Sequence, residues 1–166
     1  MNQTLKMTPD AALQHVPRQY GAVCWRMHRK KVEVLLITSR DTGRWVIPKG
    51  WPMDNRSPAQ AARQEAWEEA GVRGEIAETA IGGFNYVKLL SPTRSCECAV
   101  EVFALRVSEL LDKFPERKER RRKWFTAEKA ARKVNEPQLR QVLLALNDQF
   151  AAGLLAPAPE QALALA

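Results

Sequence analysis

The stretch that decides the fold is residues 50–72, which read GWPMDNRSPAQAARQEAWEEAGV. Ser57 can cap a helix N-terminus, Pro58 suits the first helical position, and Gln60 completes a capping box with Ser57. Gly71 is a natural end for the same helix, because glycine adopts the left-handed conformation without steric cost. We therefore predict a helix that begins at Pro58 and ends just before Gly71.

Three glutamates, Glu65, Glu68 and Glu69, share one face of this helix. Their spacing of i, i+3 and i+4 confines them to an arc of about 100°. A solvated acidic face is the ordinary interpretation of such residues, but no Lys or Arg follows Glu65 or Glu68 four residues later. Glu65 instead faces Glu69, a like-charge pair that is unfavourable on a helix. The pattern favours neutralisation by a cation, and oxygen ligands on a rigid element suit Mg²⁺ or Mn²⁺.

Divalent cations at this position predict a particular chemistry. Next to a pyrophosphate they would withdraw charge from its oxygens, lower the pKa of a bound water and align that water for attack on phosphorus. A glutamate that is not fully used as a ligand could take the water's proton. Cationic side chains nearby would stabilise the charge of the transition state.

The segments around the helix read mostly as strands. Residues 19–27 and 31–38 form two of them, and Pro48 ends a third over residues 44–47, after which Gly50 permits a tight turn. We further expect an extended segment over 75–89 with a kink or bulge at 82–83, strands over 94–107 and 123–126, and helices over 127–133 and 137–152.

This order of elements predicts an α/β or α+β sandwich in which a mixed β-sheet carries helices on both faces. A stripe of small residues along the acidic helix would let it pack closely on the sheet; the stripe consists of Ala59, Ala62, Ala66 and Ala70. Trp124 and Phe125 are interpreted as core residues.

Composition places the chain among soluble globular proteins. Its 166 residues fit one domain, 45% of them are apolar, and no apolar run is long enough to span a bilayer. The first 17 residues lack the apolar run of a secretory signal, so we expect a cytoplasmic location. Cys96 and Cys98 should face the same side of a strand as a pair of buried thiols, rather than bind a metal.

The net charge of +7 is concentrated in residues 113–133, where ten basic residues stand against three glutamates. Such a segment suggests an anionic partner, although a solvated surface run has the same composition. A nucleic-acid binder using this segment is therefore an alternative function, as is an enzyme acting on the 5′ end of RNA. The run lacks interleaved aromatic residues and a known binding motif, so nucleic acid is the less favoured partner.

Residues 50–72 resemble the Nudix box, which is a glycine, five residues, a glutamate, seven residues, and then Arg-Glu-apolar-x-Glu-Glu-x-Gly-apolar. Gly50 stands at the first glycine, and the later fixed positions are held by Glu65, Ala66, Glu68, Glu69, Gly71 and Val72. Arg56 stands where the family has a glutamate. Gln64 stands where the family has an arginine that orients a catalytic glutamate. A Nudix-fold sensor that binds its ligand without cleaving it is therefore a further alternative.

The resemblance implies a Nudix-like α/β/α sandwich over residues 18–152, between an N-terminal extension (1–17) and a C-terminal tail (153–166) for which disorder is the expectation. It also implies a magnesium-dependent hydrolase, with manganese as an alternative ion. The metal ligands would be Gly50, Glu65, Glu68 and Glu69, and the three glutamates would also be the catalytic residues. Glu68 and Glu69 would carry the metals, with Glu65 as a ligand or as the base.

Within the family, the chain is most similar to the diphosphoinositol polyphosphate and diadenosine polyphosphate hydrolases, in residues 18–23, 34–40 and 121–125. This similarity implies a highly phosphorylated small-molecule substrate, either a dinucleoside polyphosphate or an inositol pyrophosphate. Its implied contacts are Arg18, Arg40, Lys49, Arg94 and Arg122.

Three residues outside these sets are also candidates. Many Nudix enzymes add a carboxylate from outside the box, and Glu97 and Glu101 could supply it, although both also read as ordinary exposed strand residues. Trp51 follows Gly50 and could stack on an adenine or pack as a lid.

Overall fold

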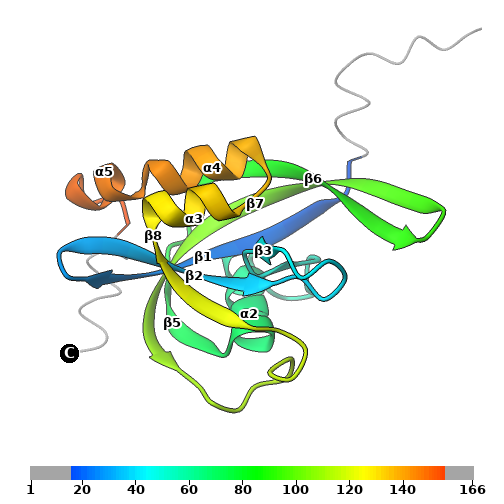
Figure 1. Cartoon of the computed structure of the whole chain (residues 1–166), viewed down its shortest axis with the longest axis horizontal. Coiled ribbons are helices and arrows are strands. Elements are labelled where there is room, and N and C mark those ends of the chain that lie inside the picture. The colour runs from blue at the N-terminus through cyan, green and yellow to red at the C-terminus, as the bar shows by residue number, and fades with distance from the viewer. Residues whose placement is uncertain (1–15, 156–166) are drawn as a thin grey trace, which may run out of the picture.

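A mixed β-sheet with helices on both faces builds the molecule, as the computed structural model shows in Figure 1. The structure describes residues 16–155; most of the expected N-terminal extension and C-terminal tail lies outside the described residues. The elements are β1 (Arg18–His28), β2 (Lys31–Thr38), β3 (Trp45–Val46), β4 (Lys49–Gly50), α2 (Pro58–Ala70), β5 (Val72–Ile76), β6 (Gly82–Ser91), β7 (Arg94–Leu110), β8 (Arg122–Thr126), α3 (Ala127–Lys133), α4 (Pro137–Leu144) and α5 (Leu146–Ala151).

The sheet has the central order β3-β2-β1-β7-β5, and β4 pairs with β1, β6 with β7 and β8 with β2. Strands β1 and β7 are parallel, while the other pairs that the structure describes are antiparallel. The predicted mixed sheet is therefore confirmed. No helix within residues 16–155 combines the length and the apolar character needed to cross a bilayer.

Alternate residues of the central strands supply two separate cores. On β1, Val23 and Trp25 face the core beneath α3, α4 and α5, whereas Ala22 and Cys24 face the core beneath α2. Because both faces of the sheet are covered, β2 reads as an almost continuous apolar run. The predicted alanine stripe lies buried in the core under α2 (Ala59, Ala62, Ala66 and Ala70), so that the helix lies close to the sheet.

Several expected boundaries are wrong. The extended segment over 75–89 is two strands, β5 and β6, which both pair with β7. Its irregularities lie at Arg73/Gly74 and between Leu89 and Ser91, not at 82–83. The helix expected over 137–152 is interrupted at Ala145, which separates α4 from α5.

Local pairing also overrides the turn expected at Gly50. Lys49 and Gly50 form β4, which pairs with Gly21 and Tyr20 of β1. Residues 49–50, which sequence patterns assign to a loop, therefore form a short strand because they pair with β1.

The cysteine and aromatic expectations are largely confirmed. Cys24 and Cys98 are buried, but Cys96 is only partly buried. Phe125 lies in the core, and Trp124 packs against the core under α2.

Candidate active site

Helix α2 carries the acidic residues, and both of its ends are fixed by the predicted signals. The Ser57 Oγ accepts a hydrogen bond from the Gln60 backbone at 3.1 Å, and the Gln60 side chain accepts one from the Ser57 backbone at 2.9 Å. Gly71 has the left-handed φ of 66° and ends the helix. Fixed ends set the rotation of the helix, and hence the direction in which its glutamates point.

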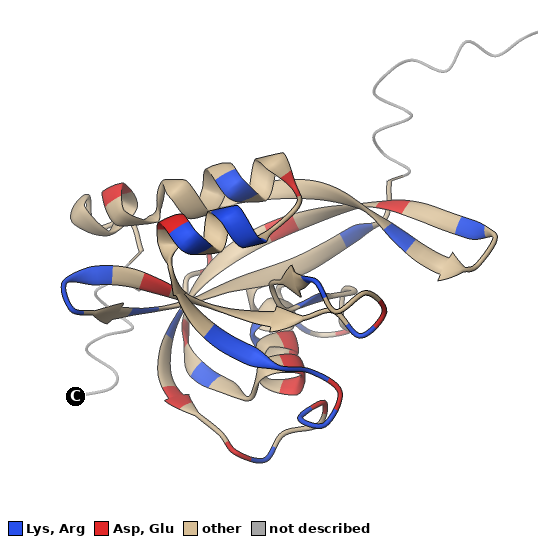
Figure 2. Cartoon of the chain, viewed as in Figure 1, with Lys and Arg blue, Asp and Glu red and all other residues tan. Residues whose placement is uncertain are grey.

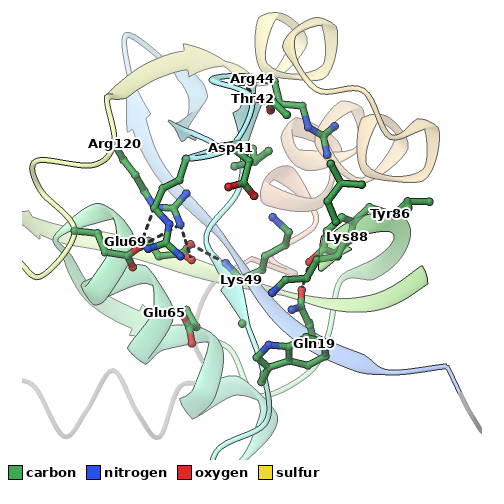
Figure 3. A pocket seen from close by; sticks show the side chains of 18 residues that line it. Gln19, Asp41, Thr42, Arg44, Lys49, Glu65, Glu69, Tyr86, Lys88 and Arg120 are labelled. Carbon is green, nitrogen blue, oxygen red and sulfur yellow. Dashed lines mark hydrogen bonds and ion pairs between the residues drawn. The ribbon is translucent and has the colours of Figure 1, made fainter. Parts of the chain in front are cut away.

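A cleft of about 390 Å³ opens along one side of α2. Glu65 and Glu69 of α2 line it together with Lys49 of β4, and Tyr86 and Lys88 reach it from β6. Figure 3 shows the two carboxylates on one wall and Tyr86 and Lys88 on the opposite wall. Charges of both signs therefore meet in one concave site, which suits an anionic ligand accompanied by cations.

Gly50 is required by the position of Glu65. A Cβ atom placed on Gly50 would collide with the carboxylate of Glu65. The bare backbone of β4 thus leaves the space in which this carboxylate lies. This contact gives a physical reason for a glycine fifteen residues before the glutamate.

Glu69 is the most constrained of the three glutamates. It is 8% exposed, its Oε2 accepts a hydrogen bond from the Lys49 backbone at 3.1 Å, and its Oε1 accepts one from Arg120 Nη2 at 3.2 Å. Burial raises the pKa of Glu69 to about 7, against the opposing effect of Arg120 and Lys49.

Glu65 is less constrained but more strongly perturbed. Burial, together with the neighbouring charges of Glu69 and Glu68, raises its pKa to about 8. No side chain within residues 16–155 donates a hydrogen bond to its carboxylate. Two carboxylates that share a desolvated site in this way hold protons near neutral pH unless a cation replaces them.

Two residues of the loop before β8 complete the carboxylate wall. Arg120 donates to Glu69, to Glu116 at 3.2 Å and to the Thr38 carbonyl at 3.1 Å, and its side chain is 9% exposed. Glu116 lines the cleft and also pairs with Arg40 at 3.4 Å. Sequence reasoning singled out neither residue, since Arg120 is one of several cations in the basic run and Glu116 lies 51 residues beyond Glu65.

The predicted phosphate-binding residues divide into two groups. Arg40 and Lys49 line the cleft, and burial lowers the pKa of the Lys49 ammonium. Arg18 and Arg94 are exposed and do not line it. Arg122 donates to the Ala70 carbonyl at 2.8 Å and closes the end of α2.

Two further cationic residues that the sequence did not predict also line the cleft. Arg44 does so while its Nη1 pairs with the buried Glu136 at 2.7 Å, and Lys88 does so from β6. Neither Glu97 nor Glu101 lines the cleft; the carboxylates from outside α2 that do so are Asp41 and Glu116. Figure 2 shows basic and acidic residues interleaved along the loop between β7 and β8.

Comparison with known proteins identifies this arrangement. A family model described as the NUDIX domain matches residues 17–146, which is most of the chain. The chain belongs to the Nudix family. The Nudix box is thereby the segment 50–72, and its helix is α2.

Among curated Nudix relatives, the chain is 39% identical over 104 residues to "Nudix hydrolase 12, mitochondrial" of Arabidopsis thaliana, which covers 60% of the chain and 51% of the relative. It is 30% identical over 131 residues to "Diphosphoinositol polyphosphate phosphohydrolase 3-alpha" of Mus musculus, covering 78% of the chain and 73% of the relative. The chain spans about half to two thirds of the length of the first relatives it matches.

A solved structure described as an Ap4A hydrolase of C. elegans shares the fold with a TM-score of 0.60 at 22% identity, covering 83% of the chain and 99% of that structure. The α/β fold with a mixed sheet is therefore that of Nudix structures.

The two departures from the Nudix box lie in contact with each other. Arg56 Nη1 donates to Gln64 Oε1 at 3.2 Å, and Gln64 Nε2 donates to Glu68 Oε1 at 3.1 Å. Glu68 itself does not line the cleft. Arg56 thus holds the Gln64 amide in the orientation in which its Nε2 donates to Glu68.

The donor set fits a hard divalent cation. Glu65 and Glu69 offer carboxylate oxygens in a cleft where burial raises the pKa of both, and a bound cation would favour their charged forms. Within residues 16–155 no three acidic, histidine or cysteine side chains converge closely enough to hold an ion by themselves. Mg²⁺ suits such an incomplete set, because it keeps several waters and shares its ligands with substrate phosphates.

Proposed function

We propose that the protein is a metal-dependent pyrophosphohydrolase that cleaves a phosphoanhydride bond in a highly phosphorylated small molecule, a dinucleoside polyphosphate or an inositol pyrophosphate. The observation that carries the proposal is the cleft in which Glu65 and Glu69 face the cations Arg40, Lys49 and Lys88. Membership of the Nudix family and the printed activities of the relatives support it.

Glu65 and Glu69 would hold the metal from the wall of the cleft, and Glu68 from beside it on the same helix, with Mg²⁺ or Mn²⁺ as the proposed ion. When bound, the ion supplies Lewis acidity to phosphate oxygens and lowers the pKa of a coordinated water. Gly50 contributes by leaving the Glu65 carboxylate its space.

The protein groups have separable roles in the reaction. Both oxygens of Glu69 are engaged, by Arg120 and by the Lys49 backbone, so this residue is suited to a fixed ligand. Glu65 accepts no such hydrogen bond, so once a bound cation has displaced its proton this carboxylate is suited to take the proton of the attacking water. Arg40, Arg44, Lys49 and Lys88 would bind phosphate oxygens and neutralise charge that develops on the leaving group.

The test is a product screen with Mg²⁺, Mn²⁺ or chelator across dinucleoside polyphosphates, inositol pyrophosphates, nucleoside triphosphates and nucleotide sugars. We expect metal-dependent release of a phosphate or nucleotide, reduced at least a hundredfold in Glu69→Gln and strongly in Glu68→Gln. Asp148→Asn, which neutralises a carboxylate on α5, is the matched control and should keep full activity. Unchanged turnover in both glutamate variants would remove the mechanism.

A ligand-binding sensor is the second candidate function. The hydrogen bonds that already engage the Glu69 carboxylate favour it. Arg120 occupies one carboxylate oxygen, and the polar chain from Arg56 to Glu68 replaces a direct ion pair. Tight binding of a phosphorylated ligand with no product after long incubation with either metal would select this function over hydrolysis.

A further inference from the structure

The lining of the cleft includes exposed apolar residues that a polyphosphate alone would not use. Trp51 lines it and is 41% exposed, and Val87 and Leu89 line it from β6 with 62% and 61% exposure. None of the three belongs to either hydrophobic core. Trp51 is thus a large aromatic side chain that lines a charged cleft without packing in a core, which indicates a ligand with an apolar part.

The face of the indole ring is directed toward the opposite wall. Lys88 Nζ lies 4.9 Å from the centre of the Trp51 ring, above its face. One face of the aromatic ring is therefore turned toward β6, where the Lys88 ammonium lies over it. A planar group that slid onto this face would displace the ammonium, which could then pair with a phosphate of the same ligand.

Covalent connection sets the distance between this ring and the carboxylates. Trp51 directly follows Gly50, whose backbone packs against the Glu65 carboxylate. A group stacked on the ring would therefore have its attached phosphates within the carboxylate and cation end of the cleft. An inositol ring substituted with phosphates has no comparable apolar face, so it would leave the Trp51 ring in water.

We infer that Trp51 is a stacking platform for a nucleobase, and that the ligand of this cleft is a nucleoside polyphosphate rather than an inositol pyrophosphate. This inference rests on the proposed function for the phosphate end of the cleft. It adds a specificity-determining residue and a substrate class to that function. Base stacking on an aromatic side chain contributes about 1–3 kcal/mol per base, which corresponds to roughly a 5- to 150-fold gain in affinity.

Binding in chelator separates this inference from catalysis, since no metal is needed for the measurement. Calorimetric titration of the full chain would compare ATP with inorganic tripolyphosphate, two probes that differ by the adenosine. We expect ATP to bind the wild-type protein at least five times more tightly than tripolyphosphate. Trp51→Ala should abolish this difference without changing tripolyphosphate binding, and Trp51→Phe should keep most of it.

Two controls guard the interpretation. Leu144→Ala truncates another exposed apolar residue, on α4, and should leave both affinities unchanged. Tryptophan fluorescence should be quenched by ATP in the wild-type protein and much less in Trp51→Phe, although Trp51→Phe still binds.

Each outcome decides between defined alternatives. If Trp51→Ala weakens ATP and tripolyphosphate equally, or if inositol hexakisphosphate binds tighter than ATP and independently of Trp51, the nucleobase platform is wrong. Metal-dependent hydrolysis of another substrate would then leave the proposed function intact. If Trp51-dependent ATP binding is found without hydrolysis of any substrate, the platform stands and the hydrolase proposal fails.

Discussion

The guanidinium of Arg120 donates to the carboxylate of Glu69 at 3.2 Å while its side chain is only 9% exposed. It also donates to Glu116 at 3.2 Å and to the Thr38 carbonyl. One side chain thus links α2, the loop before β8 and the end of β2. Since such a fork of donors is matched to carboxylate geometry, it fixes the carboxylate wall of the cleft before any ligand arrives.

Replacing Arg120 by Gln should destabilise the protein by about 3 kcal/mol, because it leaves Glu69 buried without its cation. Urea denaturation measures the change in the free energy of unfolding. Arg117→Gln, an exposed change in the same loop, should change it by less than about 0.5 kcal/mol. Arg120→Lys should lie between, since it keeps the charge but loses the fork. Equal effects at 117 and 120 would show that only the net charge of the loop matters.

The sequence predicts those parts of the carboxylate wall that depend on contacts between residues close together along the chain. Ser57, Gln60 and Gly71 act within a few residues, so the ends of α2 were predicted correctly. The glutamate face followed from helical periodicity alone. Arg120 and Glu116 reach α2 only because the loop before β8 returns to it, and the Glu116 N–H bonds the Glu68 carbonyl at 3.0 Å. Such tertiary contacts leave no periodic signal, so the interpretation of residues 113–133 as an undivided basic segment missed them.

The same distinction explains why some of the predicted site residues do not line the cleft. Arg122 carries the right charge for phosphate binding, but β8 pairs with β2 in a register that directs it to the end of α2. Glu97 and Glu101 share a strand face as expected, yet β7 does not present them to the cleft. Residue type and spacing predict which chemistry is available, whereas register decides which side chains take part.

Replacing Gly50 by Ala should destabilise the fold and weaken metal binding, because the added methyl group would displace the Glu65 carboxylate. We expect a cost of about 1–3 kcal/mol, as for overpacking of a close contact. The control is the same change in a Glu65→Ala background, where the obstructing carboxylate is absent. There Gly50→Ala should cost less than about 0.5 kcal/mol, so a double-mutant cycle gives a clear coupling energy. Additive costs would mean that Gly50 is needed for its backbone conformation instead.

Without metal, the protein should lose stability as the pH rises from about 5 to 8.5. The folded-state pKa values of Glu65 and Glu69 are raised to about 8 and about 7, above the value of about 4.3 of an unfolded glutamate. The folded state therefore holds more protons in this window, and stability falls as these protons are lost. The stabilising effect of the two carboxyl protons would be complete below about pH 4 and mostly lost by about pH 8.5.

Thermal unfolding at several pH values, in chelator and in excess Mg²⁺ or Mn²⁺, measures this linkage. Because metal ligands must be deprotonated, the metal should raise Tm more at pH 8.5 than at pH 6. Glu65→Gln should flatten the pH dependence of the metal-free protein. Glu128→Gln, which changes an exposed glutamate on α3, should leave it unaltered. A metal-induced rise in Tm that is equal at both pH values would contradict a proton-coupled site.

The hydrogen bond between Arg56 and Gln64 can be tested by placing at these two positions the residues that the Nudix box has there, a glutamate at 56 and an arginine at 64. While Arg56 donates to Gln64 Oε1, the amide must present its Nε2 to Glu68. Arg56→Glu would turn the amide around, so that its oxygen faces Glu68. We therefore expect kcat to fall by about threefold or more with little change in KM, because Glu68 loses its donor and Arg56 does not line the cleft.

Adding Gln64→Arg to Arg56→Glu should restore the lost activity, since an arginine at 64 can then pair with a glutamate at 56 and with Glu68. Arg63→Glu makes the same change of charge as Arg56→Glu, on an exposed side chain next to Gln64. It should lower kcat less than Arg56→Glu does. Steady-state kinetics of Arg56→Glu, Gln64→Arg and the double mutant yields the coupling between positions 56 and 64, with Arg63→Glu as the control. Unfolding free energies should barely differ, because the hydrogen bond between Arg56 and Gln64 is exposed to solvent. If the double mutant shows only the sum of the two single effects, the orientation of Glu68 does not depend on this chain of hydrogen bonds.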